Sequence, residues 1–184
     1  MSISPAVQDL LDRNKAIVPQ FQPLNLSLAA GTKPLPMVAV VSCTDPRGLP
    51  ERIFGVTSNE VFMLRANGGR IETVFNDMLA LDHFFGVTDI VILHHTDCGF
   101  SHMTQSNIHA DLQRRFPEAD PAYIDSLPFH TIDSLEQSVR DDIQFIHNSV
   151  LVKKELKDRT VGFIVDINTG QLTQVQGIVA DAPQ

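Results

Sequence analysis

The stretch "DIVILHHTDCGFSH" (residues 89–102) joins an apolar run to a dense group of polar side chains. Its first half is rich in isoleucine, valine and leucine, which is typical of a strand buried on both faces of a parallel sheet. Two histidines, an aspartate and a cysteine then fall within residues 94–98. Because the active sites of open α/β sheets lie at the carboxyl ends of the strands, this junction is a candidate site.

Outward from this stretch, strand patterns alternate with helix patterns. Helical periodicity extends over 70–86 and 130–152, and further apolar runs predict strands at 37–42 and 60–66. Residues 160–175 read as a strand, an "NTG" turn and a returning strand. We therefore predict an α/β fold with a mostly parallel central sheet, flanking helices and an antiparallel C-terminal edge strand.

The first 35 residues have a different character. Residues 4–18 have the pattern of a helix, with Ser4 as its N-cap and Pro5 in its first turn. Residues 19–36 contain four prolines and are predicted to be an extended connector. We predict one domain over 1–184, in which residues 36–176 form the core. The N-terminal helix and arm (1–35) are expected to pack on a partner subunit, with coverage of the chain's own core as the alternative.

The composition narrows the class of protein. The chain has 184 residues, a formal net charge of −8 and 43% hydrophobic residues. An acidic chain lacks the basic surface that nucleic acids or anionic lipids require, so we expect neither partner. No secretory leader or membrane span is expected, which predicts a cytoplasmic protein. The two cysteines are not expected to form a disulfide in that compartment.

Cys43, His95 and Cys98 have the types and spacing of metal ligands. His-x-x-Cys in a turn after a strand brings both side chains to one point, and a cysteine at the end of a neighbouring strand can join them. Three such ligands suit one Zn²⁺ and leave its fourth position open, as in catalytic sites. The alternative is two buried thiols and a loop histidine. His94 alternates with His95 along the strand and is expected to be a hydrogen-bonded core residue.

Asp45 and Arg47, in "CTDPR", are candidate catalytic residues beside the first cysteine. Asp-x-Arg can close as a bidentate ion pair, which lowers the pKa of the aspartate and fixes its orientation. Asp45 could then orient a water on the metal. It could instead occupy the fourth metal position and switch the site off, or the pair could be an ordinary loop salt bridge.

Together, "CTDPR" and "HHTDCG" resemble the motifs of the β-class carbonic anhydrases, and the likeness extends over residues 36–176. The resemblance implies a zinc enzyme with one Zn²⁺ per chain, held by Cys43, His95 and Cys98, and an Asp45–Arg47 dyad. It also implies a homodimer, in some members a homotetramer, with a substrate pocket shared across the dimer interface.

The sequence departs from this family's pattern after the second predicted strand. The family's Arg-Asn-Ala-Gly appears here as Arg65-Ala66-Asn67-Gly68, followed by Gly69. The resemblance implies that these five residues border the substrate, where the backbone amides of 66–69 could bind developing negative charge. The alternative for Gly68 and Gly69 is a plain turn between strand and helix. Outside this loop, three apolar residues, Phe54, Val61 and Phe84, are candidate pocket walls or plain core. Two histidines, His102 and His109, are candidate proton shuttles or ordinary surface residues.

The expected reaction is the reversible hydration of CO₂ to bicarbonate. Carbonyl sulfide and carbon disulfide hydrolases of the same family are the alternative, because the attacking group would be the same and only the pocket would differ. A third possibility, of another class, is an inactive zinc-binding protein. A cysteine-redox role is disfavoured because the two thiols do not form a C-x-x-C motif.

Overall fold

The computed structural model describes residues 3–22, 37–57 and 60–177. The chain forms two compact units, residues 1–34 and 35–184. The first contains helix α1 (Pro5–Ile17) and a 3-10 turn, η1 (Val18–Gln20). Ser4 caps α1 as predicted, because its Oγ accepts the N–H of Val7. Most of the predicted connector, residues 23–36, lies outside the described residues, and its packing on a partner stays a prediction.

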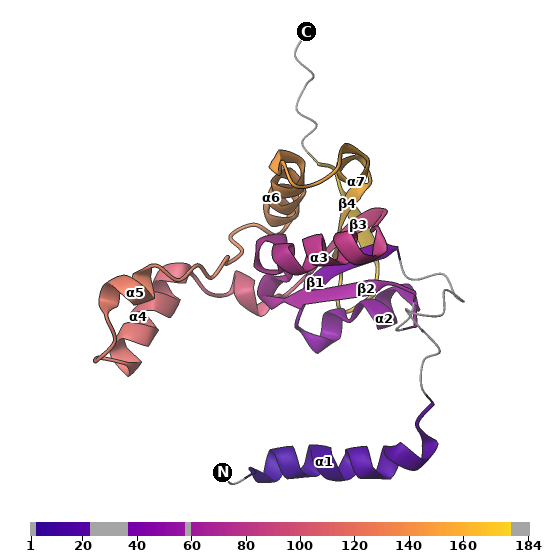
Figure 1. Cartoon of the computed structure of the whole chain (residues 1–184). Coiled ribbons are helices and arrows are strands. Elements are labelled where there is room, and N and C mark those ends of the chain that lie inside the picture. Colours follow the sequence, from indigo (N-terminus) through magenta and orange to yellow (C-terminus); the bar gives the residue numbers. More distant parts are fainter. Residues whose placement is uncertain (1–2, 23–36, 58–59, 178–184) are drawn as a thin grey trace. The chain divides into compact units, whose positions relative to one another are not determined.

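The second unit contains a five-stranded sheet in the order β2-β1-β3-β4-β5 (Figure 1). All neighbouring strands are parallel except the pair β4 and β5 at one edge. The predicted fold class is therefore confirmed, including the antiparallel C-terminal strand. The strands are β1 (Val38–Cys43), β2 (Phe62–Ala66), β3 (Asp89–His95), β4 (Thr160–Val165) and β5 (Leu172–Val175).

The two predicted core helices form, but both are shorter than the sequence pattern. The first, α3 (Phe75–Phe85), follows a 3-10 turn, η4 (Ile71–Val74), and ends at Gly86 in the left-handed conformation. The second, α6 (Leu135–Asn148), begins only after Ser134, whose Oγ accepts the Gln137 N–H. The residues before this cap are not helical.

Four further helices were not predicted, because they are short or mostly polar. Two of them, α4 and α5, occupy the segment between the "TDCG" turn and α6. The four are α2 (Pro50–Phe54), α4 (Gln105–Arg115), α5 (Pro121–Asp125) and α7 (Lys154–Asp158). None of the helices in the described part of the chain has the length and apolar character that a membrane crossing requires.

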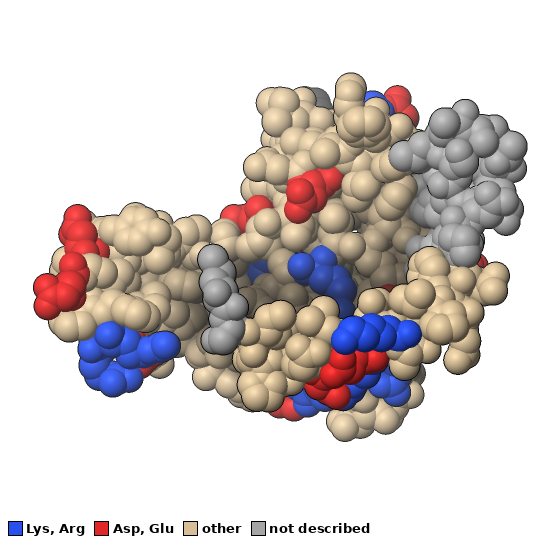
Figure 2. Space-filling view, turned by 60° about the horizontal axis from the view of Figure 1, so that its bottom comes forward, with Lys and Arg blue, Asp and Glu red and all other residues tan. Residues whose placement is uncertain are grey.

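The sheet has two unequal faces (Figure 1). The larger core lies between one face and helices α3, α6 and α7, around fully buried side chains such as Met78, Ile92 and Ile146. On the other face, Ile53 and Phe54 of α2 cover a smaller cluster around Val40 and Leu93. Figure 2 shows acidic and basic side chains interspersed on the face in view. The larger core holds β1 and β3 in register, Ser42 opposite Leu93, so that both strands end at the same edge.

Candidate active site

Cys43, His95 and Cys98 converge at the carboxyl edge of the sheet. Cys43 is the last residue of β1, His95 is the last residue of β3, and Cys98 follows in the next turn. The two Sγ atoms lie 3.8 Å apart, and both cysteines are free thiols. One ring nitrogen of His95 joins them, so that three ligand atoms lie within 4.8 Å of one another. This buried group could hold a metal ion.

The orientation of His95 leaves one nitrogen free for a ligand. Its Nδ1 lies 2.9 Å from the carbonyl oxygen of Thr96, and because a carbonyl only accepts, Nδ1 carries the proton. Its Nε2 is buried and has no hydrogen-bond partner among the described residues. Gly48 packs against the ring at 3.4 Å. The lone pair on Nε2 is therefore fixed in direction, and no hydrogen-bond donor among the described residues faces it. A metal ligand requires this arrangement.

The thiols are also arranged to share protons. The hydrogen bond with Cys98 lowers the pKa of Cys43, and the Asp45 N–H, 3.4 Å from Cys43 Sγ, lowers it further. The same sulfur pair raises the pKa of Cys98, and burial adds to this. Burial opposes protonation of His95, but the nearby Cys43 raises its pKa overall. The sulfurs of Cys43 and Cys98 and Nε2 of His95 thus form a set of ligand atoms that fits a metal cation.

Asp45 and Arg47 form the expected bidentate pair. Arg47 Nε and Nη2 donate to the Asp45 carboxylate at 2.8–3.1 Å, and the Arg47 backbone N–H donates to Asp45 Oδ1 at 2.8 Å. These hydrogen bonds lower the pKa of Asp45 to about 2. The carboxylate is therefore turned toward Arg47 and is not a member of the Cys43–His95–Cys98 group.

Asp97 is a part of the site that sequence reasoning missed. Its Oδ2 accepts Arg47 Nη1 at 2.8 Å, and its backbone oxygen accepts Arg47 Nη2 at 2.9 Å. Asp97 has a φ of +52°, which few residues other than glycine, asparagine and aspartate adopt readily. An aspartate between two candidate ligands, beside a predicted ion pair, was the available signal.

The predicted loop 65–69 divides into supporting residues and one cavity residue. Arg65 Nε and Nη2 donate to the backbone oxygens of Cys43 and Asp45, each at 3.1 Å, and so hold the turn that carries both. Ala66 is half-buried at the end of β2 and its oxygen accepts the Thr44 N–H. The structure thus places Arg65 and Ala66 behind the cavity rather than in its lining.

Gly68 and Gly69 are buried and have positive φ values of +69° and +73°. A β-carbon at Gly69 would lie 3.1 Å from both the Cys43 nitrogen and His94 Cδ2. Gly69 is therefore required where the loop passes directly behind the first cysteine. Close packing thus explains Gly69, whereas the structure calls for glycine at Gly68 only through its positive φ.

Asn67 is the predicted loop residue that lines the cavity beside the cluster. This cavity, about 290 Å³, is bordered by Cys43, Thr44, Asp45, Asn67, Cys98 and Phe100. Thr44 Oγ1 donates to Asn67 Oδ1 at 2.8 Å. The side-chain oxygen of Asn67 is thus occupied, which leaves its NH₂ group to donate.

The other candidates lie elsewhere. Phe54 and Val61 pack in the smaller core, and Phe84 is exposed on α3 beside a separate apolar groove. His102 is exposed and bonds Asp97 Oδ1 at 2.9 Å, whereas His109 Nε2 donates to the Leu127 oxygen at 2.8 Å. Phe100 and Thr44, which do line the cavity, were not predicted.

Comparison with known proteins assigns the family. The sequence model of the carbonic anhydrase family matches residues 38–172. Beta-carbonic anhydrase 1 of Mycobacterium tuberculosis is 31% identical over 159 residues, which cover 82% of this chain and 93% of that protein. The chain belongs to the β-carbonic anhydrase family. The resemblance to that family seen in the sequence is thereby confirmed.

Solved structures support the same assignment. The carbonic anhydrase of Streptococcus mutans superposes with a TM-score of 0.80 at 29% identity, covering 96% of this chain and all of that one. A carbon disulfide hydrolase, at 18% identity and a TM-score of 0.64, covers 97% of this chain and 94% of that one. This second likeness is one of fold alone.

A second polar cluster lies behind the candidate site of this member of the β-carbonic anhydrase family. His94 Nε2 donates to Asp142 Oδ2 at 3.1 Å, and its Nδ1 lies 2.8 Å from Ser138 Oγ. Arg70 Nε donates to Asp142 Oδ1 at 2.8 Å. A serine, a histidine and an aspartate in this order resemble a hydrolytic triad, but His94 and Asp142 are fully buried. His94 is thus a hydrogen-bonded core residue, as the sequence predicted.

Proposed function

We propose that this protein catalyses the reversible hydration of CO₂ to bicarbonate, with one Zn²⁺ per chain held by Cys43, His95 and Cys98. The observation that carries the proposal is the unpartnered Nε2 of His95, which meets two sulfurs beside a cavity that Asp45 also lines. Thiolate and imidazole ligands favour zinc over harder cations such as Mg²⁺. Bound there, zinc would supply a Lewis acid able to lower the pKa of water.

Asp45 and Arg47 are the proposed catalytic pair. With a pKa of about 2, Asp45 is a carboxylate at working pH and can only accept a hydrogen bond. Arg47 occupies one side of that carboxylate and so limits its rotation. Asp45 can accept a hydrogen bond from the attacking water and so aim the oxygen lone pair at the substrate carbon.

The cavity suits a small substrate that becomes an oxyanion. The ring of Phe100 and the Cys98 side chain provide apolar wall, which is sufficient for CO₂. The Asn67 NH₂ group, oriented by Thr44, can donate to an oxygen of bicarbonate as negative charge develops. An amide donor favours oxygen over sulfur, because sulfur accepts hydrogen bonds weakly. This proposed contact supports CO₂ over carbon disulfide, which has no oxygen, and leaves carbonyl sulfide, which has one, to be distinguished by assay.

The test is a two-substrate assay of zinc-loaded protein whose metal content has been measured. We expect rapid CO₂ hydration and slow hydrolysis of carbonyl sulfide and carbon disulfide. Hydrolysis of either sulfur compound in excess of CO₂ hydration would replace the proposed substrate. No turnover of any of the three between pH 6 and 9, with one zinc per chain, would indicate a zinc-binding protein without this activity.

Two variants separate metal binding from turnover. Cys98→Ser is expected to lose zinc and activity together. Asp45→Asn is expected to keep zinc and lose about 10²- to 10³-fold in kcat, comparable to removal of one transition-state hydrogen bond. Asp111→Asn, which removes an exposed carboxylate of α4, is the control for the change in charge and should be unaffected. An Asp45→Asn enzyme with full turnover would contradict the proposed role of Asp45.

We also propose a homodimer, with a homotetramer as the alternative. Apolar side chains of the first unit, including Leu10, Leu11 and Phe21, are exposed within the chain, and so is Phe84 of α3. Such surfaces are typical of subunit contacts. Light scattering coupled to size-exclusion chromatography gives the assembly state, and a monomer at micromolar concentration would contradict the proposal.

A further inference from the structure

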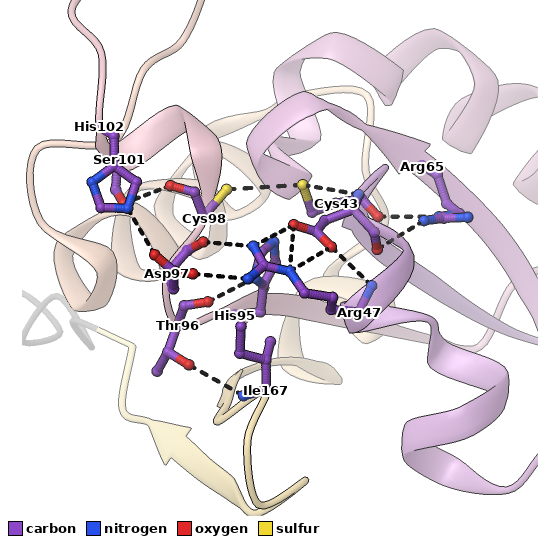
Figure 3. Close-up of polar contacts among 11 residues, drawn as sticks. Cys43, Arg47, Arg65, His95, Thr96, Asp97, Cys98, Ser101, His102 and Ile167 are labelled. Carbon is purple, nitrogen blue, oxygen red and sulfur yellow. Dashed lines mark hydrogen bonds and ion pairs between the residues drawn. The ribbon is translucent and has the colours of Figure 1, made fainter.

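The guanidinium group of Arg47 lies between two carboxylates (Figure 3). On one side it donates to Asp45 through Nε and Nη2. On the other side Nη1 donates to Asp97 Oδ2 at 2.8 Å and Nη2 to the Asp97 backbone oxygen at 2.9 Å. A planar guanidinium held at both ends has little freedom to rotate. The orientation of Asp45 therefore depends on what holds Arg47 from behind.

Asp97 is itself fixed in place. It lies in the turn between His95 and Cys98, so its backbone position is tied to two candidate metal ligands. Asp97 has a φ of +52°, and in this conformation both its carboxylate and its backbone carbonyl contact Arg47. The remaining carboxylate oxygen, Oδ1, is 2.9 Å from Nε2 of His102. Each oxygen of Asp97 thus has a partner.

We propose that Asp97 is a positioning residue, which anchors Arg47 and through it keeps the Asp45 carboxylate aimed at the cavity and off the Cys43–His95–Cys98 group. The inference rests on the proposed function of Asp45. Through Arg47, Asp97 links the turn that contains His95 and Cys98 to the turn that contains Cys43 and Asp45.

This role is one of geometry and not of proton transfer. Arg47 stays protonated under all working conditions, so it cannot pass a proton between Asp97 and Asp45. Stabilisation of the fold is also a poor explanation, because the side chains of Arg47 and Asp97 are 47% and 57% exposed and exposed ion pairs add little stability. What remains is the fixed direction of the guanidinium.

Two substitutions that tolerate a positive φ test the role without backbone strain. Asp97→Gly removes the carboxylate, whereas Asp97→Asn keeps an oxygen acceptor for Arg47 Nη1. For Asp97→Gly we expect kcat to fall about tenfold, the low end of the effect of supporting residues at metal sites, with KM and zinc content unchanged. Asp97→Asn should recover most of that loss. Asp111→Asn again serves as the control for charge.

A double-mutant cycle identifies the path of the effect. If Asp97 acts through Arg47, Asp97→Gly should have no further effect on kcat in an Arg47→Ala background. Independent, multiplicative losses would overturn the inference, and so would an Asp97→Gly enzyme with the kcat of the wild type. If Asp97→Gly does not fold, Asp97→Ala, which also removes the carboxylate, decides: a reduced kcat at constant KM supports the role and an unchanged kcat overturns it.

A readout without turnover separates this inference from the proposed function. Replacement of the metal by Co²⁺ gives a visible absorption spectrum that reports the number and type of ligands. We expect the spectrum of Asp97→Gly to differ from that of the wild type because Asp45 gains freedom to reach the metal, and Asp45→Asn in the same chain should abolish the difference. Identical spectra would overturn the inference even if the wild type proves inactive toward CO₂.

Discussion

Two polar clusters lie on either side of the end of β3, and consecutive histidines belong to different ones. His94 joins Ser138, Asp142 and Arg70 in the buried cluster between the sheet and α6. His95 faces the sulfurs of Cys43 and Cys98 near the exposed ion pairs of Arg47. The alternation of side chains along a strand is the sole cause of this separation.

The clusters differ in how completely their polar atoms are paired. Both ring nitrogens of His94 have partners, and so do both oxygens of Asp142. By contrast, Nε2 of His95 is buried and lacks a partner among the described residues. A fully paired buried group stabilises the fold, whereas a buried lone pair without a partner costs stability unless a ligand occupies it. The difference assigns stability to one cluster and ligand binding to the other.

The largest effect is expected at His95. In His95→Ala, zinc binding and CO₂ hydration should both fall to background, because one of three ligands is gone. The metal-free protein should keep its circular dichroism spectrum, since the ring loses only one local hydrogen bond, from Nδ1 to the Thr96 oxygen, and Nε2 has no protein partner among the described residues. Metal analysis after dialysis and a stopped-flow assay measure the outcome. Retention of one zinc per chain in this variant would contradict the proposal that His95, unlike His94, is a metal ligand.

The next effect is expected in the buried cluster. Asp142→Ala leaves the side chain of Arg70, 9% exposed, without its close carboxylate partner. The free energy of unfolding of the metal-free protein should fall by about 3–5 kcal/mol, as when one partner of a buried ion pair is removed. Asp111→Ala, which breaks an exposed ion pair with Arg114, should cost less than about 1 kcal/mol. Equal losses in urea unfolding would mean that burial does not distinguish the clusters.

Gly69 touches both clusters and should show a smaller effect on each. A methyl group there would press on the Cys43 nitrogen and on His94 Cδ2, both at 3.1 Å, at a φ of +73°. Gly69→Ala should lower the free energy of unfolding by about 2–4 kcal/mol, through crowding and backbone strain together. Gly170 has a φ of +74° and nothing within 4 Å of the added methyl, so Gly170→Ala isolates the strain. A loss no greater than in Gly170→Ala would show that the crowding is relieved.

The sequence could bring Cys43, His95 and Cys98 together because the parallel sheet does most of the positioning. Once 37–42 and 89–95 are neighbouring strands, Cys43 and His95 must end at one edge, and Cys98 follows three residues later. Alternation then assigns His94 to the opposite face. The mostly parallel sheet follows from the alternation of strand and helix patterns and the antiparallel edge from the C-terminal hairpin pattern, whereas the strand order came from the structure.

Contacts between turns could not be predicted in this way. Asp97 reaches Arg47 only because its backbone adopts a positive φ, and Thr44 reaches Asn67 across two separate loops. Neither contact follows from a periodic pattern. The helices α4 and α5 were missed because α4 is strongly polar and α5 is only five residues long. Roles for Arg65 and Gly69 near the substrate stay predictions, and the structure adds that Arg65 holds the Cys43 turn and that Gly69 packs against it.

The smallest effect is expected at Ser138, in the buried cluster. Its hydroxyl lies 2.8 Å from His94 Nδ1 and donates to the Leu135 oxygen, also at 2.8 Å. Ser138→Ala removes both contacts without a change in charge, and should lower the free energy of unfolding by about 1 kcal/mol. Zinc content and kcat should stay unchanged, because the hydroxyl contacts the histidine that faces away from the sulfurs.

The control for this loss is Ser106→Ala on exposed α4, where the free energy of unfolding should change by less than about 0.5 kcal/mol. A fall in zinc affinity or kcat in Ser138→Ala, with stability as in the control, would show that the buried cluster acts on the metal site through β3. The clusters would then be parts of one functional unit. An effect on unfolding alone means that two consecutive histidines of one strand serve separate ends, one holding α6 to the sheet and the other presenting a ligand at its edge.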